Sequence, residues 1–245
     1  MLLLKKKVGK IVSLCVLLVF TISVPLIGFT AKFSPSEGSS VAFYKEINDS
    51  DIVWIYNLTG EWHGGYGINI DDTDPWSNWS YYASNYDWVS GAGTSGDPYL
   101  LTNVLIDGLG QETNLITIKN SNAVFRIEDC ILYNTDYYYW DESRCNAIYF
   151  DNVENGWVEN VETYNCMNGI RLKNSQRNTI QKTWAMNHYT SGIVVSGGSQ
   201  NKIRNNTISE ESGIRLVDGT FNNDVKKNII FSGTYMNNGI HLSNS

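Results

Sequence analysis

The segment Asn168-Gly-Ile-Arg-Leu172 recurs with small changes through the second half of this 245-residue chain. Each copy places a small or polar residue before Gly or Ala, followed by an isoleucine, a variable residue and an aliphatic or aromatic one. The isoleucines of six copies are Ile116, Ile148, Ile170, Ile193, Ile214 and Ile240. They are separated by 32, 22, 23, 21 and 26 residues. Self-similarity at a period of roughly 20–50 residues indicates a repeat architecture.

The residues after each copy also recur. A pair of turn-forming residues comes first: Asn120-Ser121, Asn152-Val153, Asn174-Ser175, Gly197-Gly198, Asp218-Gly219 and Asn244-Ser245. A second apolar segment then centres on Ile127, Val158, Ile180, Ile203 and Val225. An Asn or Lys follows it at Asn160, Lys182, Asn205 and Asn228, and a third apolar segment, such as Ile208 or Ile229-Ile230, closes the repeat.

Three short strands per repeat do not fit a helix, because their apolar residues lack a 3.6-residue period. We expect one coil of a parallel β-solenoid for about every 22 residues, in about six coils, with the aliphatic residues stacked inside. Coils about 4.8 Å apart would give a rod on the order of 30 Å long. Asparagines at equivalent turns would hydrogen-bond along the stack. A meander of antiparallel hairpins is the alternative, although hairpins do not enforce such a register.

A family resemblance adds the handedness. Gly91-Ala-Gly-Thr-Ser-Gly-Asp-Pro-Tyr-Leu-Leu101, then Val104-Leu-Ile-Asp-Gly108 and the Asn-Gly-Ile repeats, resemble right-handed parallel β-helix proteins of the NosD type. These belong to a wider pectin-lyase-like group of carbohydrate-binding proteins and sugar hydrolases. The resemblance spans residues 91–245 and implies an all-β, right-handed fold. It does not imply one activity, because the group includes lyases, hydrolases, adhesins and accessory proteins.

Two features depart from a regular solenoid. The 32-residue spacing leaves a segment of about ten extra residues within Asn134–Asn146, which we call the excursion. The sequence also stops just past the first strand of a coil, at residues 240–245. Because an open solenoid end needs a cap, we expect the β-helix domain, residues 91–245, to be truncated at its C-terminus.

The first 31 residues look like a targeting segment. Lys5, Lys6, Lys7 and Lys10 precede an uncharged apolar run at residues 11–31. This pattern is typical of a signal peptide or of an uncleaved signal anchor, a helix long enough to span a bilayer. We favour the anchor, which places the remaining chain at the cell surface. A secreted or periplasmic protein is the alternative. The net charge of −7 argues against a nucleic-acid partner.

Residues 32–90 are rich in aromatic side chains, including Trp54, Trp62, Trp76, Trp79 and Trp88. They predict an N-terminal cap that plugs the first coil, or alternatively a surface that stacks on sugars. The run Asn69-x-Asp71-Asp72-x-Asp74 has oxygen ligands suited to calcium. It lacks the EF-hand spacing and glycine, which favours a turn before Pro75 and no calcium cofactor.

The excursion supplies the candidate glycan-binding residues. Aromatic rings and a carboxylate in a loop that projects from one coil are typical of a binding site on one face of a solenoid. These residues are Tyr137, Tyr138, Tyr139, Trp140 and Asp141. A loop that folds back over the solenoid wall is an equal alternative.

Catalytic and metal-binding residues are harder to assign. The acids Glu128, Asp129, Asp136, Asp141, Glu142, Asp151, Glu159 and Glu162 show no Asp–Asp pair recurring on one ladder, so we assign no catalytic residue. The resemblance to NosD-type proteins implies a role in copper binding. Copper favours Met, Cys and His ligands. The copper candidates are Cys166, Met167, Met186 and His188, but the next coil carries Glu210 and Glu211 instead.

The leading prediction is an exported or membrane-anchored β-helix protein that binds polysaccharide or another envelope component without catalysis. Two alternatives remain open. One is a polysaccharide lyase or glycoside hydrolase, and the other is a periplasmic copper-binding accessory protein.

Overall fold

The computed structural model describes residues 29–33, 41–45, 53–54, 67–136, 141–209, 212–231 and 238–243. The chain divides into two units, residues 1–56 and 57–245. In the first unit, β1 (Phe29–Phe33) pairs antiparallel with β2 (Val41–Lys45), and β3 is Val53–Trp54.

The predicted targeting helix lies outside the described residues except for its last three positions. Residues 29–31 belong to β1, and the targeting segment predicted at residues 1–31 stays a prediction. The segment Phe29–Phe33 alternates apolar and polar residues, which is the period of a strand. Within the described parts of the chain, we find no helix with the length and apolar composition needed to cross a membrane.

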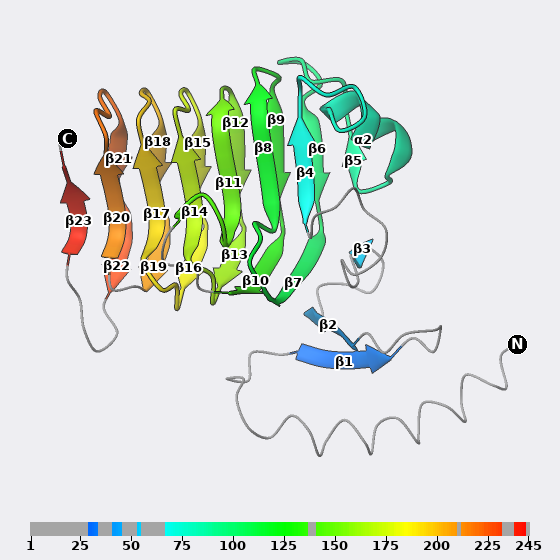
Figure 1. Ribbon diagram of the computed structural model, residues 1–245, viewed down its shortest axis with the longest axis horizontal. Coiled ribbons are helices and arrows are strands. Elements are labelled where there is room, and N and C mark those ends of the chain that lie inside the picture. Colours follow the sequence, from blue (N-terminus) through cyan, green and yellow to red (C-terminus); the bar gives the residue numbers. More distant parts are fainter. Residues whose placement is uncertain are drawn as a thin grey trace, which may run out of the picture. The chain divides into compact units, whose positions relative to one another are not determined.

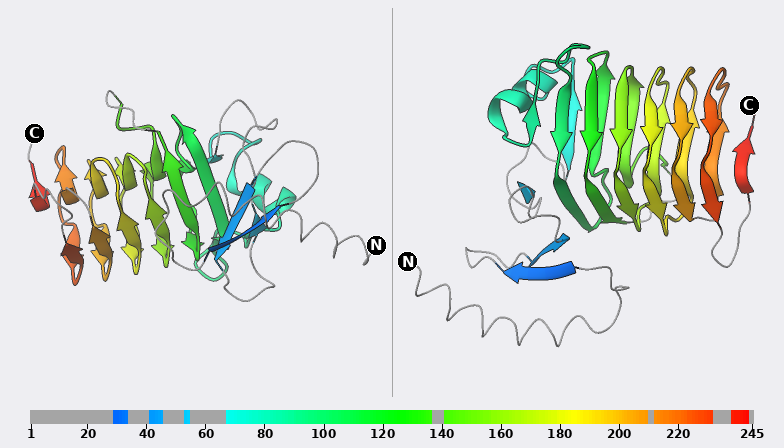
Figure 2. Two further views of the ribbon diagram at one scale, coloured as in Figure 1. Left: turned by 90° about the horizontal axis from the view of Figure 1, so that it is seen from below. Right: turned by 180° about the vertical axis from the view of Figure 1, so that it is seen from behind.

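The second unit is a solenoid of three sheets (Figures 1 and 2). The first sheet contains β4 (Ile68–Asp71), β8 (Ile116–Ser121), β11 (Asn146–Val153), β14 (Asn168–Lys173), β17 (Ser191–Ser196), β20 (Ser212–Val217) and β23 (Asn238–Leu242). The second contains β5 (Val89–Ser90), β6 (Tyr99–Thr102), β9 (Phe125–Glu128), β12 (Gly156–Glu159), β15 (Thr179–Gln181), β18 (Lys202–Arg204) and β21 (Asp224–Lys226). The third contains β7 (Val104–Gln111), β10 (Ile131–Thr135), β13 (Glu162–Tyr164), β16 (Trp184–Met186), β19 (Thr207–Ser209) and β22 (Ile229–Phe231). Neighbouring strands are parallel, apart from the antiparallel pair β5 and β6.

The predicted isoleucine ladder is confirmed. Ile148 pairs with Ile116 on one side and Ile170 on the other, and the same register continues to Ile240. The ladder isoleucines are completely buried until the last, Ile240, which is half exposed. The glycine of the motif permits close packing at the corner of the coil, because a Cβ on Gly192 would lie 2.4 Å from Ile208 Cγ2.

The second and third apolar segments form ladders of their own. Ile127, Val158, Ile180, Ile203 and Val225 stack in register through the second sheet. In the third sheet, Ile208 pairs with Ala185 below and Ile230 above. Three inward rows therefore fill the interior of the rod, as the repeat predicted.

The turn pairs fall where the backbone enters the left-handed region. The φ angles of Asn120, Asn152 and Asn174 are 51°, 58° and 48°, and those of Gly197 and Asp218 are 67° and 59°. Asn, Asp and Gly adopt this conformation at the lowest cost. The φ angles of the residues that follow the second sheet, Asn160, Lys182 and Asn205, are also in the left-handed region. The Asn, Asp and Gly residues at these turns are therefore favoured by backbone geometry, whereas Lys182 adopts the same conformation at a higher cost.

Asparagine ladders run along the stack, as expected. Asn178 donates from its backbone N and its Nδ2 to Asn201 Oδ1, and Asn201 does the same to Asn223. After the second sheet, the ladder residues are Asn206 and Asn228, joined at 3.0 Å. Each amide satisfies backbone groups that the turns leave unpaired.

The solenoid starts earlier than the predicted residue 91. β4 pairs with β8 so that Ile68 lies in the isoleucine ladder against Ile116. Helix α2 (Trp79–Asn85) follows and lies at this end of the rod (Figure 1). Trp79 is 1% exposed, stacks on Tyr99 and donates from Nε1 to Ser121 Oγ, which agrees with the cap interpretation for this tryptophan.

We predict that Asn206→Ala lowers the free energy of unfolding by about 2–4 kcal/mol. The substitution removes the acceptor of the Thr183 backbone N–H and the donor to the Ile180 carbonyl. The neighbouring control, Asn205→Gly, keeps the left-handed turn and should change stability by less than about 1 kcal/mol. Urea unfolding followed by circular dichroism measures both. Equal effects would contradict the ladder's role.

Candidate functional site

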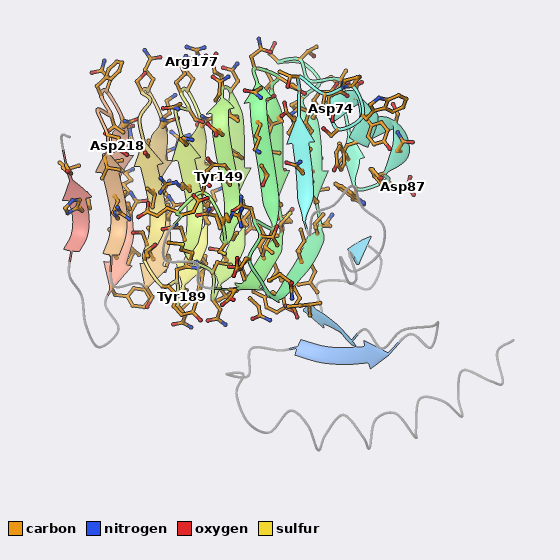
Figure 3. The ribbon with its side chains drawn as sticks, viewed as in Figure 1. Asp74, Asp87, Tyr149, Arg177, Tyr189 and Asp218 are labelled. Carbon is orange, nitrogen blue, oxygen red and sulfur yellow. The ribbon has the colours of Figure 1, made fainter. Side chains whose placement is uncertain are left out.

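One row of side chains crosses the outer face of the first sheet. Tyr149, Arg171, Val194 and Arg215 occupy successive strands in register, alternating with the inward isoleucines. Figure 3 shows Tyr149 in the middle of this face. Although the row points outward, Val194 is fully buried and Arg171 is only 9% exposed. Another part of the chain must therefore cover the face here.

The described end of the excursion, residues 141–146, covers part of this face. Tyr137, Tyr138, Tyr139 and Trp140 lie outside the described residues, so their predicted role in glycan binding stays a prediction. The green chain entering β11 passes in front of β14 in Figure 1. Asp141 Oδ1 accepts from the backbone N and the hydroxyl of Ser143, and Asn146 Nδ2 donates to the Glu142 carbonyl at 3.0 Å. These bonds fix the segment that carries Glu142.

Glu142 joins two strands of the sheet through its carboxylate. Its Oε2 pairs with Arg171 Nη1, and its Oε1 lies 3.2 Å from Arg215 Nη1. Burial alone would raise the pKa of Glu142, but the charges and hydrogen bonds of Arg215 and Arg171 outweigh burial and lower the pKa. The alternative in which the excursion folds back onto the wall therefore holds for this described end.

Arg171 is not fully satisfied by this contact. Its side chain is 10% exposed, yet Nε is closed off from solvent and has no hydrogen-bond partner among the residues that the structure describes. A buried donor left unpaired costs about 1–3 kcal/mol, and native proteins contain few of them. Arg171 is therefore one of the few described residues with a buried, unpaired side-chain donor.

Tyr149 and its neighbours complete the cluster. The Tyr149 hydroxyl donates to Asp151 Oδ2 at 3.1 Å, and Lys173 Nζ lies 3.4 Å from the same oxygen. Burial, and secondarily the Asp151 charge, raise the pKa of Tyr149, so the phenol stays protonated near neutral pH. Two guanidinium groups, a phenol and an ammonium group thus line one face, with carboxylates beside them. Such a set suits the recognition of polar or anionic groups.

The second sheet brings two carboxylates together that sequence analysis treated separately. Glu128 pairs in register with Glu159, one residue after the ladder positions Ile127 and Val158. Arg126 Nη2 lies 2.5 Å from Glu128 Oε1 and 3.2 Å from Glu159 Oε2. The shared offset from the ladder could have revealed this pair, because residues at one offset share a face.

The surroundings of Glu128 and Glu159 shift the pKa values of the two carboxyl groups in opposite directions. Burial, with the charges of Glu159 and Asp129, raises the pKa of Glu128 despite the opposing effect of Arg126. Burial also acts to raise the pKa of Glu159, but hydrogen bonds from Lys182, Gln181 and Trp157 outweigh it and lower the pKa. Trp157 donates from Nε1 to Glu159 at 2.9 Å. One acid is therefore biased toward the protonated form and its neighbour toward the charged form.

The copper candidates are spread between the interior and the surface. Met186 lies on the outer row of the third sheet, whereas Cys166, Met167 and His188 are buried. His188 Nδ1 accepts from the Cys166 backbone N at 3.1 Å, and Nε2 lies 2.9 Å from Thr163 Oγ1. His188 would have to give up one of these bonds to bind a metal ion. Burial raises the pKa of the Cys166 thiol to about 12.

The acidic run before α2 forms a turn. Asp71 Oδ1 accepts from the Thr73 backbone N and hydroxyl, and Asp74 accepts from the backbone N of Trp76 and from Ser77. Asp72 accepts from Ser121. In the part of the chain that the structure describes, no group of three or more His, Cys, Asp or Glu side chains is placed to hold a metal ion.

The buried imidazole makes stability depend on pH. Burial lowers the pKa of His188 from 6.5 to about 3, so the folded protein keeps the ring neutral while the unfolded chain binds a proton below pH 6.5. Stability contributed by the neutral ring is therefore lost as pH falls. This residue should account for about 2 kcal/mol of lost stability between pH 7 and pH 5.

Urea unfolding of wild type and His188→Gln at both pH values measures this contribution. The variant is less stable at pH 7, and its deficit relative to wild type should shrink on acidification. A deficit that stays constant with pH would contradict a neutral, buried His188.

One comparison with known proteins, the family match, agrees with the architecture. Residues 88–245 match the family described as right handed beta helix region. No protein of curated function matches the chain. Among solved structures, one provisionally described as a glycosyl hydrolase, from Parabacteroides merdae ATCC 43184, is 11% identical with a TM-score of 0.22. The alignment covers 59% of this chain and 77% of that one. At this TM-score, the likeness supports no conclusion about activity.

Proposed function

The chain belongs to the right-handed beta helix family, and from this premise we propose that it is an exported protein that binds a glycan on the outer face of its first sheet. The proposed site is the cluster of Glu142, Arg171, Arg215 and Tyr149. The basic, apolar N-terminal segment supports export.

The observation that carries the proposal is the row of polar and aromatic side chains crossing β11, β14 and β20, which residue Glu142 of the excursion's described end contacts. Successive positions in such a row lie about 4.8 Å apart along the rod, so an extended polymer lying along the rod would follow the direction of the row. Arg215, whose side chain is 24% exposed, offers an accessible planar guanidinium that can donate hydrogen bonds to sugar oxygens, whereas Tyr149 and Arg171 are buried. A linear site of this kind favours a polysaccharide over a compact small molecule.

The test is a glycan-array screen of the protein, followed by titration calorimetry with each glycan that binds. Arg215→Ala should weaken binding at least tenfold, or about 1.4 kcal/mol. Arg215 suits this test because its side chain is 24% exposed, so its removal should be tolerated by the fold.

Arg177→Ala is the matched control. Arg177 also pairs with a glutamate, Glu154, but it lies in the connection between β14 and β15, away from Tyr149 (Figure 3). Its removal should leave binding unchanged. Binding that is equally weakened by both substitutions, or no binding to any glycan, would contradict the proposal.

A second candidate, glycoside hydrolysis, is supported by the Glu128–Glu159 pair on the second sheet. Retaining glycosidases place two carboxyl groups roughly 5 Å apart, and adjacent parallel strands are separated by about 4.8 Å. Opposite pKa displacements in such a pair match an acid beside an ionised nucleophile. Glu128 would protonate the leaving oxygen as Glu159 attacks the anomeric carbon and the glycosidic bond breaks. Water, deprotonated by Glu128, would then hydrolyse the glycosyl ester and restore both carboxyl groups.

Release of reducing ends from polysaccharides measures this activity. Glu159→Gln should lower the rate by about 100-fold or more. The control Glu162→Gln removes a carboxylate of the third sheet that accepts from the Tyr164 hydroxyl, and it should leave the rate unchanged. An inactive wild type, or a Glu159→Gln variant as active as wild type, would overturn hydrolysis at this pair.

A further inference from the structure

The outer face of the second sheet carries a charge pattern that inverts along the rod. We propose that this face binds the same face of a second copy of the chain, with the two rods antiparallel and a two-fold axis at β15. The first sheet, which carries the proposed glycan site, is not part of this interface. The dimer would cover Glu128 and Glu159, so hydrolysis at that pair would require the monomer.

Three rows of side chains make up the pattern. The first outward row of the sheet consists, coil by coil, of Arg126, Trp157, Thr179, Lys202 and Asp224. The second outward row consists of Glu128, Glu159, Gln181, Arg204 and Lys226. The left-handed turn after the sheet supplies the third row, Asp129, Asn160, Lys182, Asn205 and Lys227. In the second and third rows, the acids lie on the coils of β9 and β12, and the bases lie on the later coils.

A two-fold axis parallel to the strands and at β15 places β9 of one copy against β21 of the other, and β12 against β18. Facing positions away from β15 then have opposite charges or are compatible: Glu128 with Lys226, Glu159 with Arg204, Asp129 with Lys227, Arg126 with Asp224, Trp157 with Lys202, and Asn160 with Asn205. Lys182 would face its own counterpart, but it is already paired with Glu159. A two-fold axis along the rod would instead set every charge against itself. The pattern therefore selects the antiparallel arrangement.

The two outermost strands of the pattern carry ion pairs of opposite polarity. On β9, Arg126 lies 2.5 Å from Glu128, and on β21, Lys226 lies 2.6 Å from Asp224. These four side chains are between 21% and 51% exposed, so a second copy can reach them. When β9 faces β21, the two pairs form a ring of four alternating charges, in which each charge has two opposite neighbours.

The basic half of the face is unbalanced within one copy. Lys202, Arg204 and Lys227 form no salt bridge with any residue that the structure describes. Arg204 also stands in register with Lys226 on the next strand, and like charges directly opposite each other are destabilising. Lys227 occupies a left-handed turn, with a φ angle of 56°, where other coils carry Asp or Asn at a lower cost. Carboxylates of a second copy would balance these charges.

Trp157 lies one strand from the axis, near the centre of the proposed interface. In its own copy, Arg126 and Arg204 lie 5.5 Å and 5.8 Å from the centre of its ring, and Lys202 of the second copy would face the same ring. At the axis, Thr179 and Gln181 are only 5% and 8% exposed, so the longer side chains on either side make the contact. Because the strands of this sheet are short, the face is narrow, and we expect a weak association that salt weakens further.

A charge swap at one exposed pair tests the interface. Asp129→Lys makes both members of the Asp129–Lys227 pair basic, and Lys227→Asp makes both acidic. Each variant alone should dimerise at least tenfold more weakly than wild type, because a symmetric dimer contains this contact twice. An equimolar mixture of the two variants should dimerise as strongly as wild type, because opposite charges face each other again. Both substitutions suit the fold, because the two residues occupy equivalent turns, with φ angles of 54° and 56°.

Sedimentation equilibrium of the full chain in a nonionic detergent measures the dissociation constants, and circular dichroism establishes that each variant is folded. The detergent covers the apolar segment at residues 11–31. Asp218→Lys is the matched control. Asp218 occupies a left-handed turn after the first sheet and accepts from Ser196 Oγ, as Asp129 accepts from Asn160 Nδ2. Its reversal should leave dimerisation unchanged.

A wild type that stays monomeric at submillimolar concentration would overturn the inference. So would a mixture that dimerises no better than either variant, because it excludes the antiparallel pairing, or equal weakening by Asp218→Lys, which points to net charge alone. A monomeric wild type whose Lys202 is protected from acetylation by phosphatidylglycerol vesicles, and not by phosphatidylcholine vesicles, would assign the basic residues to a membrane surface and overturn the dimer as well. Each of these results would leave glycan binding on the first sheet standing, because Arg215→Ala tests it separately.

Discussion

The structure depends on one constraint, which is the exact repetition of register from coil to coil. Once Ile116 stacks beneath Ile148, every later residue at the same offset is placed on the same ladder, inside or outside. Left-handed turns at Asn120, Asn152 and Asn174 keep each corner the same length. Asparagine side chains then bind the backbone of the neighbouring coil, so a shift of one residue would break hydrogen bonds as well as apolar packing.

The same constraint builds the candidate sites. A parallel stack turns residues that are distant in sequence into a straight row, and it places Arg171 and Arg215 on one face with a single strand between them. It also sets Glu128 beside Glu159. The wall of the solenoid positions Arg171 and Arg215. The excursion supplies the carboxylate of Glu142, which pairs with both arginines.

Much of this could be predicted from sequence, because the repeat encodes it. The isoleucine spacing and the turn pairs predicted the ladders correctly. Gly67-Ile68-Asn69-Ile70 repeats the same motif, but the aromatic residues around it obscure the pattern. The sequence therefore predicts a start at residue 91, later than the first strand in the ladder, which contains Ile68. The contact of Glu142 could not be predicted, since the landing point of a loop depends on tertiary packing and not on periodicity. The Tyr137–Trp140 hypothesis stays a prediction.

The central claim is that the register brings Glu142 onto Arg171 and Arg215. A double-mutant cycle on stability tests it most directly, using Glu142→Gln, Arg215→Gln and the double variant in urea unfolding. The account predicts a coupling free energy of about 0.5–1.5 kcal/mol, reduced at high salt, because the pair is partly exposed. Strictly additive effects of the two substitutions would contradict the contact and the site built upon it.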